Sequence, residues 1–542
     1  MNLFKTNHQL KFRVLEIIAL LLILALAAYL RLANHADNPG WYTDEGTHLD
    51  IAQNLAHGGI QYMAINQATL LFSRLPLFEL LLAGSLSLMG GGISTLRALT
   101  GGLGVVSVAV LYGVVRRIQN GDSSLALLSA LMYAIYPLAI LYSRFGFSYN
   151  LLTPLVLLAY LGLWEYLSAP PAPDTQRRGG LALAALAIGI GAVSDLWMFV
   201  LAAPLLVVVL IRHWRDILWS LPLVLLPFSL YAAFMLVQTP ETLWFDLRFV
   251  LSRLNRLSVM SQLTTLALNY TILISRDHWA VLAIIGMFML RPARLQRLSL
   301  LMFLLPIVIL GRTVALYNLS FYYMIPLLPF IGLGMASAIK YGAPFISQAI
   351  RSTLLTLLDR WEWLSGQLRL RQLHGQFLSL GTSLILFAVV ATPFLTSAIW
   401  TANQVRDKYS TEIDLFLINP GDARRVAEFV NSQIMPNDVI IASPGVAWLF
   451  QAHTADFQMS VAADGQETPH LPANLPKSRF AFNPDYKQAH FVVVDNLWRN
   501  WAVWNIVGVP DMLRQMQSWS LVFKSGEIEV YCNPTASCSR IT

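Results

Sequence analysis

Long apolar stretches separated by short polar connectors dominate the first 400 residues of the chain. The first stretch, residues 14–32, is long enough to cross a hydrocarbon core of about 30 Å. No small-residue cleavage site follows it, so we interpret it as a retained span rather than a removed signal peptide. Twelve segments are candidate membrane helices: 14–32, 75–89, 97–115, 124–142, 150–167, 181–194, 197–211, 217–237, 279–290, 298–311, 321–339 and 378–399.

The basic residues decide which of these segments cross, because Lys and Arg in short connectors favour the cytoplasm. All basic connectors share the side of the basic N-terminus only if segment 75–89 does not span. That segment is short and contains Pro76 and Glu79, so we interpret it as a helix in or near the outer interface. We therefore expect an integral plasma-membrane protein with about eleven spans, a cytoplasmic N-terminus and an extracytoplasmic C-terminus. The connectors are Arg116-Arg117, Arg177-Arg178, Arg212 with Arg215, Arg291 with Arg294 and Arg297, and the loop 340–371.

The tail has the composition of a soluble protein and predicts a second domain over residues 401–542, after a transmembrane domain over 1–400 with an outer loop at 33–96. Alternating and amphipathic patterns predict a small extracytoplasmic α/β domain. No glycine-rich phosphate-binding fingerprint is present in it. The predicted elements are a helix at 421–434, strands at 438–443 and 490–495, a helix at 512–519 and a hairpin at 520–532.

Composition supports the membrane assignment, since 56% of residues are hydrophobic and only 12% are charged, about half the charged fraction of soluble domains. The net charge of +7 does not indicate nucleic-acid binding, because the basic residues lie between the apolar segments. Cys532 and Cys538 could form a disulfide or remain two free thiols.

The stretch WYTDEGTHLD places two adjacent carboxylates, Asp44 and Glu45, shortly after the first span. They open a predicted helix at 43–57, with Thr43 as its N-cap. One interpretation is helix capping and a solvated acidic surface. A metal site with His48, one turn away, would need further ligands, so no metal ligand is assigned. The third interpretation is an active-site acid.

Three arginines lie at the predicted outer ends of spans: Arg97 begins the second span, Arg144 ends the third and Arg312 ends the ninth. Snorkelling to the interface would explain each alone, whereas three on one face indicate an anion such as a lipid-linked phosphate. Aromatic residues share this face, either as an ordinary interfacial belt or for stacking on sugars. They are Trp41, Tyr42, Tyr62, Tyr142, Tyr149, Trp197, Trp244, Tyr317, Tyr322 and Tyr323.

These features, taken in order, resemble the GT-C glycosyltransferases, and among them the protein O-mannosyltransferases and lipid A aminoarabinose transferases. The matching stretches are YTDEGTHLDIAQNLAHGG (42–59), the segment 74–118, SRFGFSYNLLTPLVLLAYLGLW (143–164) and FYYMIPLLPFIGLGMA (321–336). The resemblance covers residues 1–340 and fades beyond them. It implies transfer of a sugar from a polyprenyl-phosphate donor to a protein, lipid or glycan acceptor at the outer membrane face.

The resemblance also implies roles for individual residues. Asp44 would be the catalytic base with Glu45 beside it, and Arg97 and Arg144 would lie near the donor phosphate. Arg312 is added to the phosphate-binding candidates because of its position at the outer end of a span, not from the resemblance. No cofactor is required, and nothing in the sequence supports a divalent cation. The substrate-binding candidates are His48, Tyr149, Asn150, Asp195, Tyr322 and Tyr323.

The chain departs from many relatives at three places. It has Ser148-Tyr149-Asn150 where they carry a second aspartate, and Ser194-Asp195 where they carry a Thr-Lys pair. It has Ser320-Phe321 where they place an arginine. These changes leave the sugar and the acceptor open.

Two other classes of function compete with an inverting transferase. A lipid-linked sugar flippase or transporter would typically show internal repeats and acids within its spans, whereas this chain shows no repeat and keeps its acid cluster outside them. A non-catalytic membrane module that binds a partner through its outer domain is also compatible with the sequence. Release of free polyprenyl phosphate would distinguish transfer from both.

Overall fold

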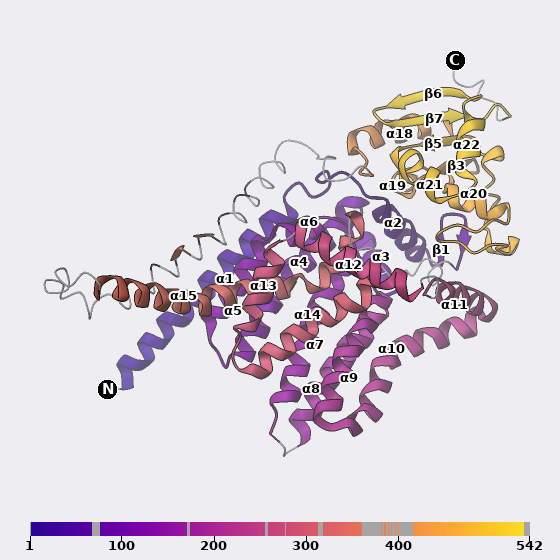
Figure 1. The fold of residues 1–542 in the computed structure, drawn as a ribbon. Coiled ribbons are helices and arrows are strands. Elements are labelled where there is room, and N and C mark those ends of the chain that lie inside the picture. The colour runs from indigo at the N-terminus through magenta and orange to yellow at the C-terminus, as the bar shows by residue number, and fades with distance from the viewer. Residues whose placement is uncertain are drawn as a thin grey trace.

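The computed structural model describes residues 2–67, 76–170, 174–254, 258–276, 278–312, 318–359 and 416–535, with scattered positions between 381 and 399. These residues form a helical bundle and, beside one end of it, a smaller domain built on a β-sheet (Figure 1). The predicted boundary near residue 400 and the aromatic Tyr317 lie outside the described residues.

The helical bundle has the architecture of a multi-pass membrane protein. Among the described residues, six helical stretches are long and apolar enough to cross a membrane, or seven if the bent pair α5–α6 is one span. The expected eleven are not all resolved as separate spans. Segments 197–211 and 217–237 fall in one apolar run, Leu196–Gln238, and segment 279–290 corresponds to the shorter apolar helix Trp279–Phe288. Segment 181–194 lies in the helix Asp174–Ala192, which is not among the candidate spans. Most of 378–399 lies outside the described residues. The helices are α1 (Asn2–Leu32), α4 (Ile93–Ile118), α5 (Ser123–Ile135), α6 (Pro137–Ser143), α7 (Tyr149–Ser168), α8 (Asp174–Ala192), α9 (Ala202–His213), α10 (Ile217–Gln238), α12 (Val259–Arg276), α13 (His278–Phe288), α14 (Ala293–Gly311) and α15 (Leu328–Asp359).

The bend between α5 and α6, 61°, has a local cause. Pro137 begins α6 and has no N–H, so it cannot donate to the carbonyl of Tyr133 one turn earlier. The guanidinium of Arg31, from α1, takes this place by donating to the carbonyls of Tyr133 (3.2 Å) and Ala134 (2.9 Å). A fully buried arginine thus completes the broken helix.

The basic connectors lie together at one end of the bundle. Arg117 pairs with Glu165 (3.0 Å), and Gln119 donates to the carbonyl of Arg291 (3.2 Å). Arg177 approaches Asp216 (3.8 Å) in the same region. This grouping agrees with the arrangement in which all these connectors share one side of the membrane.

The opposite end carries the loop after α1, then α2 (Thr43–Ala56) and a small hairpin of β1 (Gln61–Tyr62) and β2 (Ile65–Asn66). The predicted interfacial segment forms α3 (Pro76–Met89), an apolar helix shorter than a membrane span. Helix α11 (Pro240–Leu254) and the 3-10 helices η1 (Leu196–Leu201) and η3 (Asn318–Leu327) complete the bundle.

The C-terminal domain contains a five-stranded mixed sheet in the order β4-β3-β5-β7-β6. Its central strands β3 (Val439–Ala442) and β5 (Phe491–Val494) are parallel and buried, as expected for continuous runs of Val and Ile. Antiparallel β6 (Ser520–Ser525) and β7 (Ile528–Cys532) form the predicted hairpin, whereas β4 (His453–Ala455) was not expected. The helices are α18 (Pro420–Gln433), α19 (Pro444–Ala447), α20 (Phe457–Ala463), α21 (Val503–Asn505) and α22 (Val509–Met516).

Cys532 is disulfide-bonded, which favours the first of the two cysteine alternatives; Cys538 lies outside the described residues.

The outer loop and the C-terminal domain share one hydrophobic core, which includes Trp41, Leu49, Ile65, Val446 and Phe491. Helix α2 therefore lies against the orange and yellow C-terminal domain rather than facing open solvent (Figure 1). This packing places the acidic stretch at the junction between the two parts of the chain.

Candidate active site

The adjacent carboxylates of Asp44 and Glu45 lie in different surroundings. Helix α2 begins at Thr43, so its N-cap is Tyr42, one residue earlier than predicted. Neighbouring residues of a helix do not face the same way, and here Glu45 is fully buried while Asp44 is partly exposed. The two carboxylates can therefore play different chemical roles.

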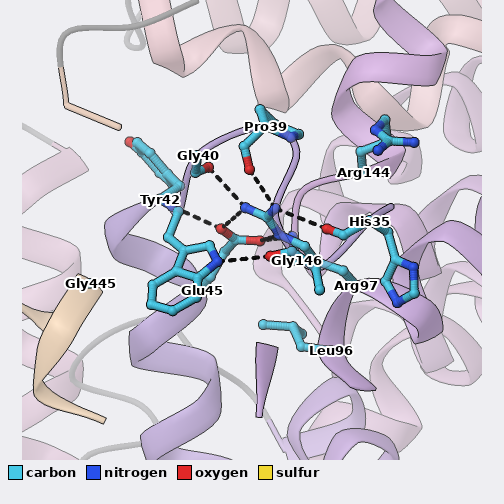
Figure 2. Close-up of polar contacts among 12 residues, drawn as sticks. His35, Pro39, Gly40, Tyr42, Glu45, Leu96, Arg97, Arg144, Gly146 and Gly445 are labelled. Carbon is cyan, nitrogen blue, oxygen red and sulfur yellow. Dashed lines mark hydrogen bonds and ion pairs between the residues drawn. The ribbon is translucent and has the colours of Figure 1, made fainter. Parts of the chain in front are cut away.

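Glu45 accepts four hydrogen bonds, two at each carboxylate oxygen. Oε1 accepts from Arg97 Nε (2.6 Å) and from the backbone N–H of Gly146 (2.7 Å). Oε2 accepts from Arg97 Nη2 (2.6 Å) and from the N–H of Tyr42 (2.8 Å). A Cβ at Gly146 would lie 2.4 Å from Leu96, so only glycine allows this backbone to come so close. Figure 2 shows the carboxylate enclosed by these donors.

Arg97 uses its five N–H groups within the protein. Beyond its bidentate pair with Glu45, it donates to the carbonyls of Pro39 (2.6 Å), Gly40 (2.9 Å) and His35 (3.0 Å). Its side chain is 0% exposed, as is that of Glu45. The planar guanidinium suits this task because its donors form a rigid fork.

Arg144 performs a similar task one helix away, at the C-terminal end of α6. It donates to the carbonyls of Leu30 (2.9 Å), Ala33 (2.8 Å) and Asn38 (2.8 and 3.1 Å). Arg97 and Arg144 thus hold the loop from α1 to α2 through its backbone. Their donors point at protein carbonyls and, for Arg97, also at the Glu45 carboxylate, rather than toward an open anion site.

Arg312, the third predicted arginine, has an exposed side chain at the C-terminal end of α14. No ion pair with another described residue involves it. Of the three arginines it is the one whose guanidinium is available to solvent.

Asp44 lies close enough to Tyr62 and Tyr322 for its charge to act on both phenol groups. Burial is the main cause that raises the pKa of Tyr62 well above its ordinary value, and the nearby carboxylates of Asp456, Asp50 and Asp44 add to this effect. Tyr62 also shares a hydrogen bond with Thr47 Oγ1 (3.3 Å). Asp44 therefore belongs to a mixed acidic and phenolic surface.

An aromatic cluster joins α2, the turn before α7 and η3. The ring of Tyr42 packs on Phe147 (5.4 Å between centroids), which packs on Tyr322 (5.0 Å). Tyr149 stacks on Tyr322 (5.3 Å) and meets Tyr323 edge-on (5.3 Å). Three predicted substrate-binding tyrosines therefore lie together beside Asp44, with Tyr322 and Tyr323 partly exposed.

The other predicted substrate-binding residues are buried and engaged within the protein. Asn150 donates to the carbonyls of Tyr142 and Phe147 (both 3.1 Å). Asp195 caps η1 by accepting from the N–H of Trp197 (2.8 Å), far along the chain from α2.

His48 pairs with Glu79 of α3 (2.6 Å), and both side chains are almost completely buried. The pair therefore fixes α3 against α2. Among the described residues, no group of three or more His, Cys, Asp or Glu side chains is arranged to hold a metal ion.

Comparison with known proteins identifies the architecture. Residues 73–244 match the model of the family described as dolichyl-phosphate-mannose-protein mannosyltransferase. This segment therefore resembles that family. The family is part of the GT-C glycosyltransferases, which use lipid-phosphate-sugar donors, so the predicted resemblance is confirmed. None of the curated proteins matches the chain in sequence.

Solved structures extend the likeness over nearly the whole chain. The apo structure of ArnT from Cupriavidus metallidurans matches 97% of this chain and 98% of its own, with a TM-score of 0.63 and 14% identity. The same protein bound to undecaprenyl phosphate matches 97% and 99%, with a TM-score of 0.59 and 14% identity. The oligosaccharyltransferase AglB from Archaeoglobus fulgidus, with an inhibitory peptide and a dolichol-phosphate, matches 96% and 74% (TM-score 0.54, 13% identity). At these identities the likeness concerns the fold.

Two contributors to the site were not among the predicted residues. Arg31 lies within the first apolar stretch, where an arginine near the end of a span already indicates a special environment. Gly146 contributes only its backbone N–H, so its residue type gave no sign that it would bind Glu45.

Proposed function

We propose that this chain transfers a sugar from a polyprenyl-phosphate carrier, of the undecaprenyl or dolichol class, to an acceptor at the extracytoplasmic membrane face. The proposed topology has about eleven spans, with the basic connectors in the cytoplasm and the domain at 401–542 outside. The observation that carries the proposal is the division of the acidic pair. Glu45 is buried and fully hydrogen-bonded, whereas the adjacent Asp44 is partly exposed, so we assign the role of base to Asp44.

The proposed step is a single displacement at the anomeric carbon. The acceptor oxygen forms a bond to this carbon as the bond between it and the carrier phosphate breaks, and the acceptor proton passes to the Asp44 carboxylate. The lipid phosphate departs with the electron pair of the broken bond. Attack opposite the leaving group inverts the anomeric centre. The partly exposed tyrosines 322 and 323 are suited to stack on the sugar ring.

The charge of the site favours an anionic donor. Arg31, Arg97 and Arg144 are buried at this end of the bundle, and Glu45 is the carboxylate that pairs with one of them. Backbone carbonyls accept hydrogen bonds from Arg31 and Arg144 without cancelling their charge, and Glu45 offsets only the charge of Arg97, so the region keeps a positive potential. We propose that Arg97 and Arg144 act on the phosphate through this potential, and that the exposed Arg312 contacts it directly.

The test uses purified full-length protein in liposomes, with membranes of the source cell as acceptor. The probes are undecaprenyl-phosphate mannose and undecaprenyl-phosphate aminoarabinose, and the measured product is free undecaprenyl phosphate. We expect Asp44→Asn to lower turnover by at least about 100-fold, since a general base contributes roughly 10²–10⁴. Asp464→Asn, at an exposed aspartate of the C-terminal domain, should retain turnover.

Each opposing result points to a different error. Wild-type turnover by Asp44→Asn would remove Asp44 as the base. Passage of intact lipid across the bilayer without release of undecaprenyl phosphate would indicate a flippase. No release and no passage with either probe would favour a binding module.

A further inference from the structure

The C-terminal domain touches the helix that carries Asp44 at an unusually close point. A Cβ built on Gly46 would lie 1.7 Å from the carbonyl oxygen of Pro444, at the start of α19. Glycine inside a helix costs about 1 kcal/mol relative to alanine, so its use at this position needs a packing reason. The reason is that backbone meets backbone here, two residues from the proposed base.

Trp448, which follows α19, occupies the space between the starts of α2 and α4. A Cβ on Gly92, the N-cap of α4, would lie 2.4 Å from its ring, and a Cβ on Gly46 would lie 3.1 Å from it. The ring also packs against Trp41 (5.3 Å between centroids). The indole therefore fixes the spacing of the two helices whose Glu45 and Arg97 form the buried pair.

The loop before α2 is also fastened to the C-terminal domain. Trp41 and Ile418 exchange two backbone hydrogen bonds (2.8 and 2.9 Å). Arg424 of α18 forms an ion pair with Asp37 and lies over the Trp41 ring (5.2 Å to the centroid). The same loop is held by Arg97 and Arg144 on its other side, so it is fixed from both directions.

The contact arises at the edge of the sheet where α/β domains usually bind their ligands, outside the carboxyl ends of neighbouring parallel strands. Ser443 follows β3 and Asp495 follows β5, and the Ser443 hydroxyl donates to the buried Asp495 carboxylate. Asp495 also accepts from the N–H of Leu497 (2.9 Å). This bond fixes the turn that presents Pro444, and Figure 2 shows Gly445 of that turn beside the start of α2. The start of α2 therefore occupies the place, at this edge of the sheet, where an α/β domain usually binds its ligand.

We infer that the C-terminal domain sets the position of Asp44, with Gly46 and Trp448 as positioning residues for the transfer reaction. This inference rests on the proposed function for its link to catalysis. It gives the C-terminal domain a role within the active site of its own chain. Removal of the contact should change turnover more than it changes binding of the carrier.

The first experiment compares Gly46→Ala with Gly84→Ala in the full-length protein. Contact below 3.0 Å is not tolerated, so the alanine must separate α2 from α19 by about 1.3 Å. A misplacement of about 1 Å can cost about 100-fold in rate. We expect Gly46→Ala to lower kcat about 100-fold with KM for the undecaprenyl-phosphate sugar within about threefold. Gly84 also lies within a helix but has nothing within 4 Å of a built Cβ, so Gly84→Ala should behave like the wild type.

A second readout is independent of the sugar and acceptor. Backbone hydrogen exchange across residues 43–52 should be faster in Gly46→Ala and unchanged in Gly84→Ala. Equal exchange and equal kcat in the two variants would overturn the inference. Absence of turnover in the wild type would instead contradict the proposed function, while the exchange result would still decide whether the C-terminal domain fixes α2.

Trp448 provides the alternative if Gly46→Ala does not fold. Trp448→Phe keeps an aromatic ring between α2 and α4, whereas Trp448→Ala removes it. We expect Trp448→Phe to restore most of the kcat and of the exchange protection lost in Trp448→Ala. Identical values for the two variants would overturn the inference.

Discussion

The carboxylate of Glu45 provides the sharpest test of the division between anchor and base. Each of its oxygens accepts two hydrogen bonds, one from Arg97 and one from a backbone N–H, at 2.6–2.8 Å. Glutamine has the same shape, but its amide nitrogen donates and does not accept. Whichever way the amide of Glu45→Gln is turned, two acceptor positions become donors that face other donors.

The size of the effect follows from burial. Glu45 and Arg97 are both 0% exposed, so the substitution leaves a guanidinium charge without its counter-charge inside the protein. Removal of one partner from a buried ion pair costs about 3–5 kcal/mol. Because the pair joins α2 to α4, we expect this cost to appear in the opening of α2. Its amides should then exchange roughly 100-fold to several thousandfold faster.

Hydrogen exchange across residues 43–52, measured on the full-length protein in nanodiscs, would report this opening. Glu241→Gln is the matched control, because Glu241 is exposed on α11 and a surface substitution should stay within about 0.5 kcal/mol. Asp44→Asn should leave the exchange unchanged while it lowers turnover by at least about 100-fold. If Glu45→Gln exchanged like its control and lost turnover as Asp44→Asn does, Glu45 would act in the chemistry and the anchoring role would be refuted.

Two further predictions concern buried acids at the junction of the domains. Burial raises the pKa of Asp456 from 3.8 to about 7, so the stability that this carboxyl contributes is complete below pH 3.8 and is lost as pH rises through 7. Asparagine can still cap α20, so Asp456→Asn should raise Tm relative to the wild type above pH 7, by the equivalent of at most about 4 kcal/mol. Below pH 4 the two proteins should have the same Tm. Arg479 pairs with the buried Asp246 (2.9 Å), and Arg479→Met should lower Tm at pH 8 by the equivalent of about 3–5 kcal/mol and by less at pH 5, where the carboxyl can take up a proton. An Asp246→Leu second change should restore Tm, and a loss that is equal at both pH values would contradict this explanation.

Much of the fold could be predicted from the sequence because long apolar runs and alternating strands are local signals. Segment 75–89 illustrates this, since its length and Pro76 predicted the short α3. The C-terminal helix at 420–433 and the strands β3, β5, β6 and β7 also follow local patterns. Strand β4 has three residues and is defined by its pairing with β3, so no local pattern marks it. The separation of 197–211 from 217–237 likewise depends on how the helices pack.

The site was less predictable because backbone groups supply most of its contacts. The position of Arg97 at the outer end of a span suggested an anion site. In the structure three of its hydrogen bonds go to carbonyls 57–62 residues away in the sequence. Every residue has a carbonyl, so a sequence cannot show which of them an arginine will find. The same holds for Gly146, whose N–H meets Glu45 only because the turn before α7 packs on α2 and α4.

The adjacency of Asp44 and Glu45 has a physical consequence for the proposed base. A base at the membrane face needs access to water and substrate, yet its position must be fixed to within a fraction of an ångström. Contacts made by the base itself reduce this access, so rigidity that comes from neighbouring residues is an advantage. Here the next residue in the helix is locked by four hydrogen bonds, and the residue after it is pressed against Pro444. The first turn of α2 therefore transfers rigidity from two buried neighbours to Asp44, so the base can stay open to its substrate.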